Sequence, residues 1–510
     1  MPEHHNIVIA IGNPRLSVHF LVLSIVLIGI YVVYYRYFHP LSKFPGPFLA
    51  SFTNVWKAYH LSTLRMPETI TKLHEEYGSV VRVGPNDLSF NSGSAVTSIY
   101  KAGRSLPKTS FYNGFTAFNP NLFGTQDDEL HALRRRQMSH AFSLQSIKDM
   151  ELLINKHIDV LCANLDSYVN SGQIANLKEL IAFYVLDVLG ELAFSQSFNA
   201  QVEKNLETLP PINDHIYLAC LMGQMPEMMP MLHCFARYLP LPWTRKLMAA
   251  RARLKSLTAA CVRRRLNDKG ANRKDLLGCL IRAVDPETGA RLTELDINTE
   301  AFAMLVAGSH TTSGTLTLLF SHLLQNREIL DKVVAEIDTI LSPKEQAAHG
   351  AISSIEGLEL SLPYTMACLQ ENFRINPVFS MPLPRRVAVP GGMKIDGFMI
   401  PQNTTVFALN HAVHHNPAIF GPDNDMFKPS RFEGAQADEL RRNLSPFSMG
   451  HRMCIGRNMA MANLLKVLTT VLRRYELEAV GLEDKIRTLS VGISEKEGQL
   501  MCRVRRRQAC

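Results

Sequence analysis

The order of apolar and polar residues along the chain predicts a mainly helical body with a minor β component. Apolar residues recur at helical spacing through much of residues 128–370, and the longest such pattern covers residues 296–324. Another helical pattern begins at Asn458. Short strands are predicted where apolar and polar residues alternate: 79–83, 88–90, 393–395, 397–400 and 405–409. Asp396-Gly397, between two of these segments, is a hairpin signal.

The most apolar part of the chain lies near its N-terminus. Residues 17–35 contain no Lys, Arg, Asp or Glu, which is close to the ~20 residues needed to span a ~30 Å hydrocarbon core. Arg36 and Lys43 follow this stretch and only Arg15 precedes it closely, which favours a lumenal N-terminus and a cytosolic body. A cleaved signal peptide is the alternative. The anchor is favoured because the stretch is long for a signal peptide and lacks a small-residue cleavage site.

These features divide the chain into three parts. Residues 1–37 form an N-terminal segment and membrane anchor. Residues 38–50 form a proline-rich hinge that includes HPLSKFPGPFLA, whose three prolines favour an extended conformation. Residues 51–510 contain no linker-like or repeated segment, so we expect one large domain.

Composition narrows the class of protein. With 46% apolar residues, a 510-residue chain can bury a large core and a cofactor. The net charge of +8 is modest, and the basic residues do not gather with aromatic residues, which argues against nucleic-acid binding. The arginines at the C-terminus are predicted to form a solvated tail. The nine cysteines show no CxxC pairs, which indicates a reducing compartment, and only Cys454 has a distinctive context.

Cys454 lies in the run FSMGHRMCIG, a glycine-flanked turn just before the last helical pattern. A thiol at a helix N-terminus faces unpaired N–H groups and the positive end of the helix dipole, which favours its thiolate. Thiolate is a soft axial ligand for haem iron. The alternative is an ordinary buried cysteine.

The run resembles the haem-binding loop of the cytochrome P-450 family, F-x-x-G-x-R-x-C-x-G, at every fixed position. The resemblance implies a haem b cofactor with Cys454 as the axial ligand of its iron. It further implies that Phe447 shields the sulfur and that Gly450 and Gly456 let the backbone approach the porphyrin. Arg452 would pair with a propionate. The family fold is mainly helical with small sheets, here preceded by a transmembrane helix.

A second motif, AGSHTT, lies inside the longest helical pattern. Gly308 costs a helix roughly 1 kcal/mol relative to alanine, so we expect something to pack close to the backbone there. Thr311 can bond back to the carbonyl of Ala307. Taken alone, these small residues could simply mark a helix crossing. The motif resembles the family's oxygen-binding stretch, [A/G]-G-x-[D/E]-T-[T/S], with His310 in place of the acid.

This second resemblance implies catalytic roles for Gly308, His310 and Thr311. Thr311 would be needed for coupled oxygen activation. Imidazole can carry protons near neutral pH, so we expect His310 to replace the missing acid in part.

Further matches concern structure and the haem propionates. Glu371 and Arg374 are three residues apart in an E-x-x-R motif, and with Arg431 they resemble the family's buried Glu-Arg-Arg network. Alone, such a pair is usually a surface ion pair of little weight. In a separate helical segment, His131 and Arg135 match the family's propionate-holding W-x-x-x-R with histidine in place of tryptophan.

Other basic residues have assignments of their own. Arg386 aligns with another propionate arginine of the family. Arg134 and Arg136, on either side of Arg135, are read as a solvated face or a docking surface.

The resemblance also locates substrate-contacting segments: 111–123, 222–231, 302–307, 378–383 and 491–493. Their phenylalanines and methionines provide an apolar lining that can adapt to shape. Core packing or membrane contact explains many of these residues equally well. The implied substrate is a lipophilic small molecule of a terpenoid, polyketide or alkaloid-like kind, since the motifs look fungal.

Together these features predict a membrane-anchored haem-thiolate monooxygenase that hydroxylates or epoxidises a lipophilic molecule in fungal secondary metabolism. The implied partners are NADPH-cytochrome P-450 reductase, which supplies the electrons, and cytochrome b5. The expected location is the endoplasmic reticulum membrane, with one membrane span and a cytosolic catalytic domain. Two alternatives remain: a family member that catalyses rearrangement, dehydration or oxidative coupling, which His310 favours, and a non-enzymatic haem carrier. Thr311 and the thiolate loop argue against the carrier.

Overall fold

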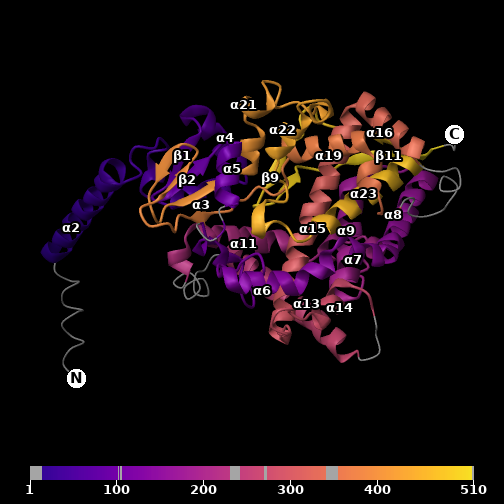
Figure 1. The fold of residues 1–510 in the computed structure, drawn as a ribbon, viewed down its shortest axis with the longest axis horizontal. Helices are drawn as coiled ribbons and strands as arrows, with labels where there is room; N and C mark the ends of the chain where they lie inside the picture. The colour runs from indigo at the N-terminus through magenta and orange to yellow at the C-terminus, as the bar shows by residue number, and fades with distance from the viewer. Residues whose placement is uncertain are drawn as a thin grey trace.

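The computed structural model describes residues 14–507, apart from residues 102, 104–105, 230–241, 269–272 and 341–353. Helices dominate the body, and helix α2 projects from it on the side of strands β1 and β2 (Figure 1). The longer helices are α2 (Pro14–Val33), α3 (Val55–Ser62), α4 (Met66–Tyr77), α5 (Gly93–Tyr100), α6 (Asp128–Ser139), α8 (Glu151–Ser171), α9 (Leu177–Phe194), α11 (Ile212–Gln224), α13 (Pro242–Asn267), α15 (Glu294–Gln325), α16 (Arg327–Ile340), α19 (Pro363–Ile375) and α23 (Arg457–Arg474).

Short helices connect these elements. The short α-helices are α7 (Leu144–Asp149), α10 (Ala200–Glu203), α14 (Leu276–Arg282), α18 (Leu358–Ser361), α20 (Asn410–His414), α21 (Pro417–Phe420) and α22 (Ala437–Arg442). The 3₁₀ turns are η2 (Leu49–Ser51), η4 (Ser110–Phe115), η5 (His140–Phe142), η6 (Leu206–Thr208), η7 (Pro226–Met228), η8 (Pro429–Phe432) and η9 (Gly450–Arg452), while η1 (Tyr34–Phe38) is a π-helical turn.

The strands form small separate sheets. The largest has the order β1-β2-β7-β4, in which β2 pairs with β7 in parallel and the other neighbours are antiparallel. The strands are β1 (Val80–Gly84), β2 (Asp87–Phe90), β3 (Ala175–Asn176), β4 (Arg385–Arg386), β5 (Met393–Ile395), β6 (Phe398–Ile400), β7 (Thr405–Ala408), β8 (Tyr475–Ala479), β9 (Thr488–Ser490), β10 (Ser494–Lys496) and β11 (Met501–Arg506). The predicted hairpin signal is confirmed, since Asp396 and Gly397 have φ values of +49° and +83° between β5 and β6.

Helix α15 runs through the helical body and packs against α9, α19 and α23 (Figure 1). Its start is set by a capping box, in which the Thr293 hydroxyl accepts from the Asp296 N–H and the Asp296 carboxylate accepts from the Thr293 N–H. From Leu316 to Leu323 the helix is buried on every side. The prediction of one long central helix is therefore confirmed.

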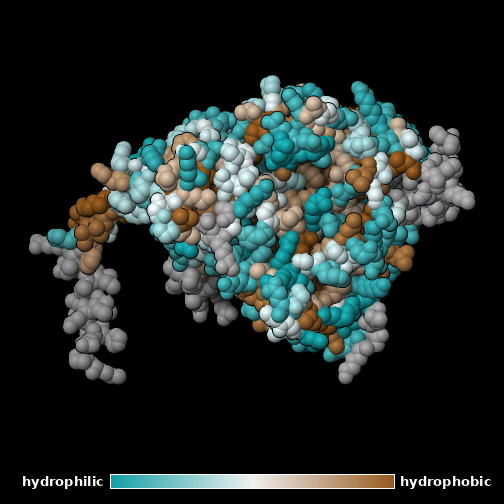
Figure 2. Space-filling view, in the orientation of Figure 1, coloured by the Kyte–Doolittle hydropathy of each residue, from teal (hydrophilic) through white to brown (hydrophobic). Residues whose placement is uncertain are grey.

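Helix α2 is apolar and exposed. Residues 17–38 are long and apolar enough to cross a membrane, and none of that span is buried against the rest of the protein. Hydrophobic surface covers α2 where it leaves the body (Figure 2). An apolar helix that the protein does not cover is consistent with a membrane anchor.

The hinge that follows α2 differs from its prediction. Hydrogen-bonded turns form there, with the Ser42 N–H donating to the His39 carbonyl at 2.8 Å. Leu41 and Phe44 are buried against the β1 sheet, and the Arg82 N–H donates to the Pro45 carbonyl at 2.7 Å. The fully extended conformation expected from the prolines is wrong for residues 39–44, because burial of two apolar side chains favours a folded path.

The C-terminal arginines also differ from their prediction. Arg503 and Arg506 lie in strand β11, which pairs with β8. Arg506 pairs with Asp166 at 2.7 Å, and Arg507 with Asp338 at 2.7 Å. The prediction of a tail is therefore wrong, since Arg503 and Arg506 lie in the middle strand of the sheet β3-β11-β8, but their side chains stay exposed to solvent, as expected.

Candidate active site

The cysteine loop (residues 447–456) contains the turn η9 and leads directly into helix α23. It closes on itself, since the Cys454 N–H donates to the Phe447 carbonyl at 2.8 Å. Gly450 has φ +74°, and a Cβ there would lie 2.4 Å from the Tyr100 carbonyl oxygen, so that position requires glycine. A Cβ at Gly456 would meet the Cys454 sulfur at 3.9 Å, an ordinary contact. Gly450 thus shapes the turn, and an approach of either glycine to a porphyrin stays a prediction.

Cys454 is exposed, whereas helix α23 behind it is largely buried. Protein atoms surround the other sides of the sulfur, and this burial raises the pKa of the Cys454 thiol, while the Gly456 N–H and Arg135 act in the opposite direction. The N–H group at the helix start therefore favours the thiolate, as expected, but burial of the free thiol outweighs it. A metal cation bound at the sulfur would reverse the balance. Phe447 packs edge-on against Phe373, with ring centroids 5.5 Å apart.

Helix α6 brings two predicted residues to the cysteine loop. Arg135 donates from Nη1 to the carbonyl of Met453 at 2.6 Å, directly before the cysteine. His131, one turn earlier, is buried and packs edge-on against His451, with ring centroids 5.8 Å apart. Burial and the neighbouring cations, Arg452 first among them, lower the pKa of His131 to about 3, so the ring is neutral. The other two arginines of this helix pair with acids: Arg134 with Asp296, and Arg136 with Asp285.

A basic cluster (Lys108, Arg385 and Arg452) lies beside the loop. The Arg452 side chain is 1% exposed, pairs with Asp128, and donates to the Thr125 carbonyl at 3.0 Å. Burial, Arg385 and Arg452 together hold the pKa of Lys108 well below its usual range. The Nε atoms of Arg385 and Arg452 are buried without a hydrogen-bond partner among the described residues. One carboxylate, that of Asp128, therefore faces three basic groups. The donors that it leaves unpaired can bind an anionic ligand.

Of the three residues of this cluster, only Arg452 was predicted from the sequence. The resemblance indicated Arg386, which is exposed in β4, while the adjacent Arg385 is buried against the ring of Tyr100. Alternation in the strand sends neighbouring side chains to opposite faces, but two residues of strand give no signal of which faces inward. Lys108, whose Nζ lies 4.3 Å from the centroid of the Tyr112 ring, was also missed, because nothing near it in sequence marks it as buried.

The middle of helix α15 presents a face of small residues (Ala307, Gly308 and Thr311). Thr311 donates from its hydroxyl to the Ala307 carbonyl at 2.7 Å, the back-bond expected from the sequence. A Cβ at Gly308 would lie 3.0 Å from Cδ1 of Leu189 on α9. The group that was expected to pack close to the backbone at Gly308 is therefore the Leu189 side chain. Ala307 and Thr311 retain accessible surface although α15 is mostly buried.

His310, on the same stretch of helix, has an acidic partner. Its Nδ1 lies 2.5 Å from Oε1 of Glu495 on strand β10, and each side chain is about a quarter exposed (24% and 25%). Asn213 of α11 donates to the same carboxylate oxygen at 3.1 Å. Burial alone would raise the pKa of Glu495, but the contacts with His310 and Asn213, with the charge of Lys178, lower it to about 2. Glu495 was not predicted, because its partner is remote in sequence.

A charge network (Glu371, Arg374 and Arg431) lies behind the cysteine loop, near Phe373. Glu371 and Arg374 form a two-pronged pair at 2.8 Å for each contact, and both side chains are fully buried. Arg431 Nε lies 3.3 Å from the same carboxylate. Arg374 also donates to backbone carbonyls, including that of Asn424 at 2.6 Å. The structure brings all three predicted residues together.

Comparison with known proteins decides the family. The cytochrome P-450 family model matches residues 45–502. The chain belongs to the cytochrome P-450 family. It is 31% identical over 463 residues to the cytochrome P-450 monooxygenase cicH of Emericella nidulans, covering 88% of this chain and 90% of that protein.

Other relatives are fungal as well. The cytochrome P-450 monooxygenase cpaH of Aspergillus oryzae is 32% identical over 464 residues, covering 89% of this chain and 86% of cpaH. Benzoate 4-monooxygenase bphA of Aspergillus niger is 28% identical over 464 residues, covering 86% and 88%. This protein is therefore a P-450 monooxygenase, and the family cofactor is a haem held by a thiolate.

The residues of this P-450 fit that cofactor. Cys454 provides an accessible sulfur, and α6 holds Arg135 next to it. Haem carries two propionates, and the basic cluster has buried donors left over after Asp128 is paired. Arg452 and Arg385 would hold the acidic arms, and the accessible α15 face provides small side chains and a hydroxyl.

The predicted substrate segments contribute aromatic side chains. Phe115 and Phe123 pack edge-on with ring centroids 5.3 Å apart, and Phe118 packs against Phe302 of α15 at 6.0 Å. Met222 is buried, while residues 230 and 231 of the methionine-rich segment lie outside the described residues.

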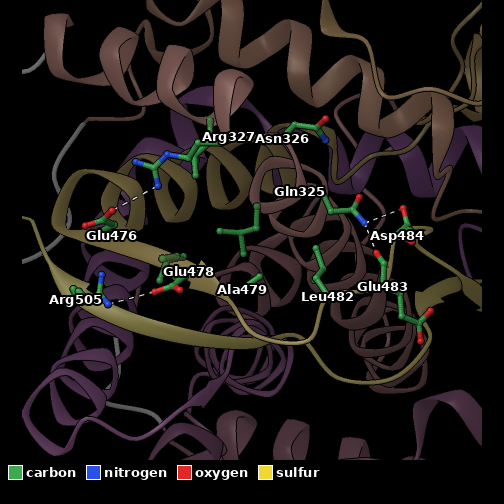
Figure 3. A pocket seen from close by; sticks show the side chains of 13 residues that line it. Gln325, Asn326, Arg327, Glu476, Glu478, Ala479, Leu482, Glu483, Asp484 and Arg505 are labelled. Atoms are coloured by element: carbon green, nitrogen blue, oxygen red, sulfur yellow. Dashed lines mark hydrogen bonds and ion pairs between the residues drawn. The ribbon is translucent and has the colours of Figure 1, made fainter.

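A separate surface pocket lies at the end of helix α15. Figure 3 shows its polar lining, in which Arg327 faces Glu476 at 3.6 Å and Arg505 faces Glu478 at 3.4 Å. The pocket begins thirteen residues after Thr311, about 20 Å along the helix axis. No predicted site residue lines it, so it is distinct from the candidate active site.

Proposed function

We propose that this P-450 is a membrane-anchored monooxygenase that hydroxylates or epoxidises a lipophilic small molecule in fungal secondary metabolism. The observation that carries the proposal is the accessible Cys454 sulfur, beside Arg135 and a basic cluster with spare buried donors. For hydroxylation, substrate, dioxygen, NADPH and one proton give the alcohol, NADP⁺ and water. The relatives support the setting, because those named above are fungal monooxygenases.

The electrons in this proposal come from NADPH through NADPH-cytochrome P-450 reductase, with cytochrome b5 as a second donor. Helix α2 would hold the protein in the endoplasmic reticulum membrane as a single span, with the catalytic domain in the cytosol. The exposed apolar surface of α2 supports an anchor of this kind.

Each site residue has a role that its contacts support. The haem, held through Cys454, supplies an iron centre that activates dioxygen. Arg452 and Arg385, with His131, would hold the propionates, and Arg135 fixes the backbone at Met453. The Thr311 hydroxyl hydrogen is engaged by Ala307, so its oxygen can accept a hydrogen bond from water on the α15 face.

The substrate in this proposal is apolar over most of its surface. Phe115, Phe118, Phe123 and Phe302 give an aromatic wall next to α15, and such walls bind lipophilic rings and chains. One relative is named for an aromatic acid, benzoate.

One observation favours a second candidate reaction. His310 replaces the acid of the family motif, and a P-450 with weakened proton delivery could instead catalyse rearrangement, dehydration or oxidative coupling. Incorporation of one atom of labelled dioxygen into the product separates the two candidates, because oxidative coupling also consumes dioxygen and electrons but leaves both oxygen atoms in water.

The test of the proposed function is an optical spectrum of the reduced, CO-bound full-length protein. A thiolate-type Soret band is expected, together with NADPH consumption that requires the reductase. A preparation that binds haem but lacks this band would overturn the proposal.

A further inference from the structure

His310 and Glu495 form a pair at a position where the family motif places one acid. The family's acid precedes the threonine in the helix itself, whereas here the carboxylate comes from strand β10 and meets the helix at Nδ1 of His310, 2.5 Å away. Because an ionised carboxylate only accepts, Nδ1 carries the hydrogen of this contact and Nε2 is the nitrogen left to exchange protons.

We propose that His310 and Glu495 together form the proton-delivery unit of this enzyme, with Glu495 as the positioning residue. The proposal rests on the proposed function, since it concerns the protons that oxygen activation consumes. For each substrate oxidised, two electrons and two protons convert one oxygen atom of O₂ to water. His310 passes each proton from Nε2, through water on the α15 face, and regains one from solvent.

The partial exposure of the pair supports this role over a purely structural one. Each side chain is about a quarter exposed (24% and 25%), so water reaches both. In contrast, the Glu371–Arg374 pair is completely buried, as a structural lock should be. The contact with Glu495 is made through Nδ1, so Nε2 of His310 does not face that carboxylate.

The surroundings keep Glu495 ionised and in place. Asn213 on α11 binds the same oxygen as His310, and the charge of Lys178 on α9, whose Nζ donates to the carbonyl of Lys496 at 2.6 Å, also lowers the pKa of Glu495. These groups face the carboxylate from the elements packed against it, and both stabilise the charged form.

The β9–β10 hairpin does not depend on Glu495 for its position. The Ser494 N–H donates to the Val378 carbonyl at 2.7 Å, and its hydroxyl lies 2.8 Å from that of Ser380. Lys178 holds the turn beyond through Lys496. Removing the charge at position 495 should therefore leave the hairpin anchored, which makes the role of Glu495 testable without loss of the fold.

The experiment compares Glu495→Gln with Glu497→Gln in the full-length haem-loaded protein with reductase. Glu497 is the matched control, because it lies on the same hairpin and pairs with Arg65 at 2.8 Å. NADPH oxidation under air, which needs no identified substrate, should fall roughly tenfold in Glu495→Gln, since general acid catalysis contributes ~10²–10⁴-fold and His310 remains. Reduction under CO should stay at the wild-type rate in both variants.

A spectroscopic readout distinguishes proton delivery from packing. A hydrogen-bond donor held near bound CO lowers the C–O stretching frequency, so Glu495→Gln should shift the band to higher frequency while Glu497→Gln leaves it in place. Rescue comes from the double variant His310→Asp with Glu495→Gln, which puts one carboxylate beside Thr311 and should recover most of the NADPH oxidation rate. His310→Asp alone sets two carboxylates against each other and should recover less.

The two proposals fail in different ways. If the wild-type protein binds haem without a thiolate-type band, the proposed function fails. If the wild type has the band and normal reductase-dependent turnover, while Glu495→Gln matches Glu497→Gln in oxidation rate and C–O frequency, only the proton-delivery role is overturned.

Discussion

The charge network behind the cysteine loop and the middle of helix α15 both hold charged groups inside the protein, but in opposite ways. Glu371 and Arg374 are three residues apart on one helix and fully buried; Arg374 also donates to surrounding carbonyls, and Glu371 accepts from the Lys428 N–H. His310 and Glu495 come from elements that are remote in sequence, and both keep a quarter of their surface. A sealed pair can only stabilise, whereas a pair open to water can also exchange protons. We therefore assign a structural role to the buried pair and a chemical role to the solvent-accessible pair.

The largest effect is expected at the thiol that the network supports. Cys454→Ser should abolish the thiolate-type Soret band and reductase-dependent turnover, because a hydroxyl does not replace a thiolate on the iron. Spectra of the reduced CO complex check this result. Cys279→Ser, at a half-buried free cysteine on α14, is the control and should keep both properties. A thiolate-type band in Cys454→Ser would show that another residue holds the haem.

The next effect tests whether the buried charge network (Glu371, Arg374 and Arg431) stabilises the fold. Arg374→Ala removes the two-pronged partner of buried Glu371 and leaves only the longer contact with Arg431 at 3.3 Å, so we expect a loss of about 3–5 kcal/mol in the free energy of unfolding and poor haem loading. Urea unfolding and haem content per protein measure it.

The matched control for Arg374 is Arg441→Ala. Arg441 makes the same three-residue spacing with Asp438 on the surface, where the side chains are 41% and 83% exposed. This pair should contribute no more than about 1 kcal/mol. Equal losses in the free energy of unfolding in the two variants would mean that burial does not determine how much the network contributes to stability.

The residues of the charge network could be predicted from the sequence, whereas the acidic partner of His310 on α15 could not, and the reason is physical. The Cys454 loop and the Glu371–Arg374 pair are local patterns, since their members lie within one turn or one helix. Glu495 meets His310 only after the chain has folded, and nothing around it in sequence marks it as a partner. The helix boundaries followed the apolar period closely: the central helix was expected over 296–324 and extends over Glu294–Gln325.

Other mismatches have the same cause. Arg385 and Lys108 are buried by tertiary contacts with Tyr100 and Tyr112, which no local pattern shows. The hinge turns because Leu41 and Phe44 are buried against the sheet. Proline content describes local preference alone, and burial of apolar surface overrides it.

A smaller effect addresses the α15 region directly. Thr311→Ala should lower coupled turnover by roughly tenfold and raise peroxide release per NADPH, because the hydroxyl that can bind water on the α15 face is lost. Thr315→Ala is the control, since Thr315 makes the same back-bond one turn later, at 2.7 Å to the Thr311 carbonyl, and is buried. Unchanged yield and peroxide release in Thr311→Ala would remove Thr311 from the proton path.

The smallest effect concerns Gly308 of α15, which is compared with Gly450 of the cysteine loop. At Gly308 an added Cβ would meet the end of the Leu189 side chain at 3.0 Å, which can shift, while alanine favours the helix by up to about 1 kcal/mol. These terms oppose each other, so Gly308→Ala should change the free energy of unfolding by less than about 1 kcal/mol. Gly450→Ala should cost more, because φ is +74° and the obstacle, the Tyr100 carbonyl at 2.4 Å, is backbone. Urea unfolding measures both variants. A large loss in Gly308→Ala that Leu189→Ala does not relieve would mean that the α15 face needs glycine for a reason other than this contact.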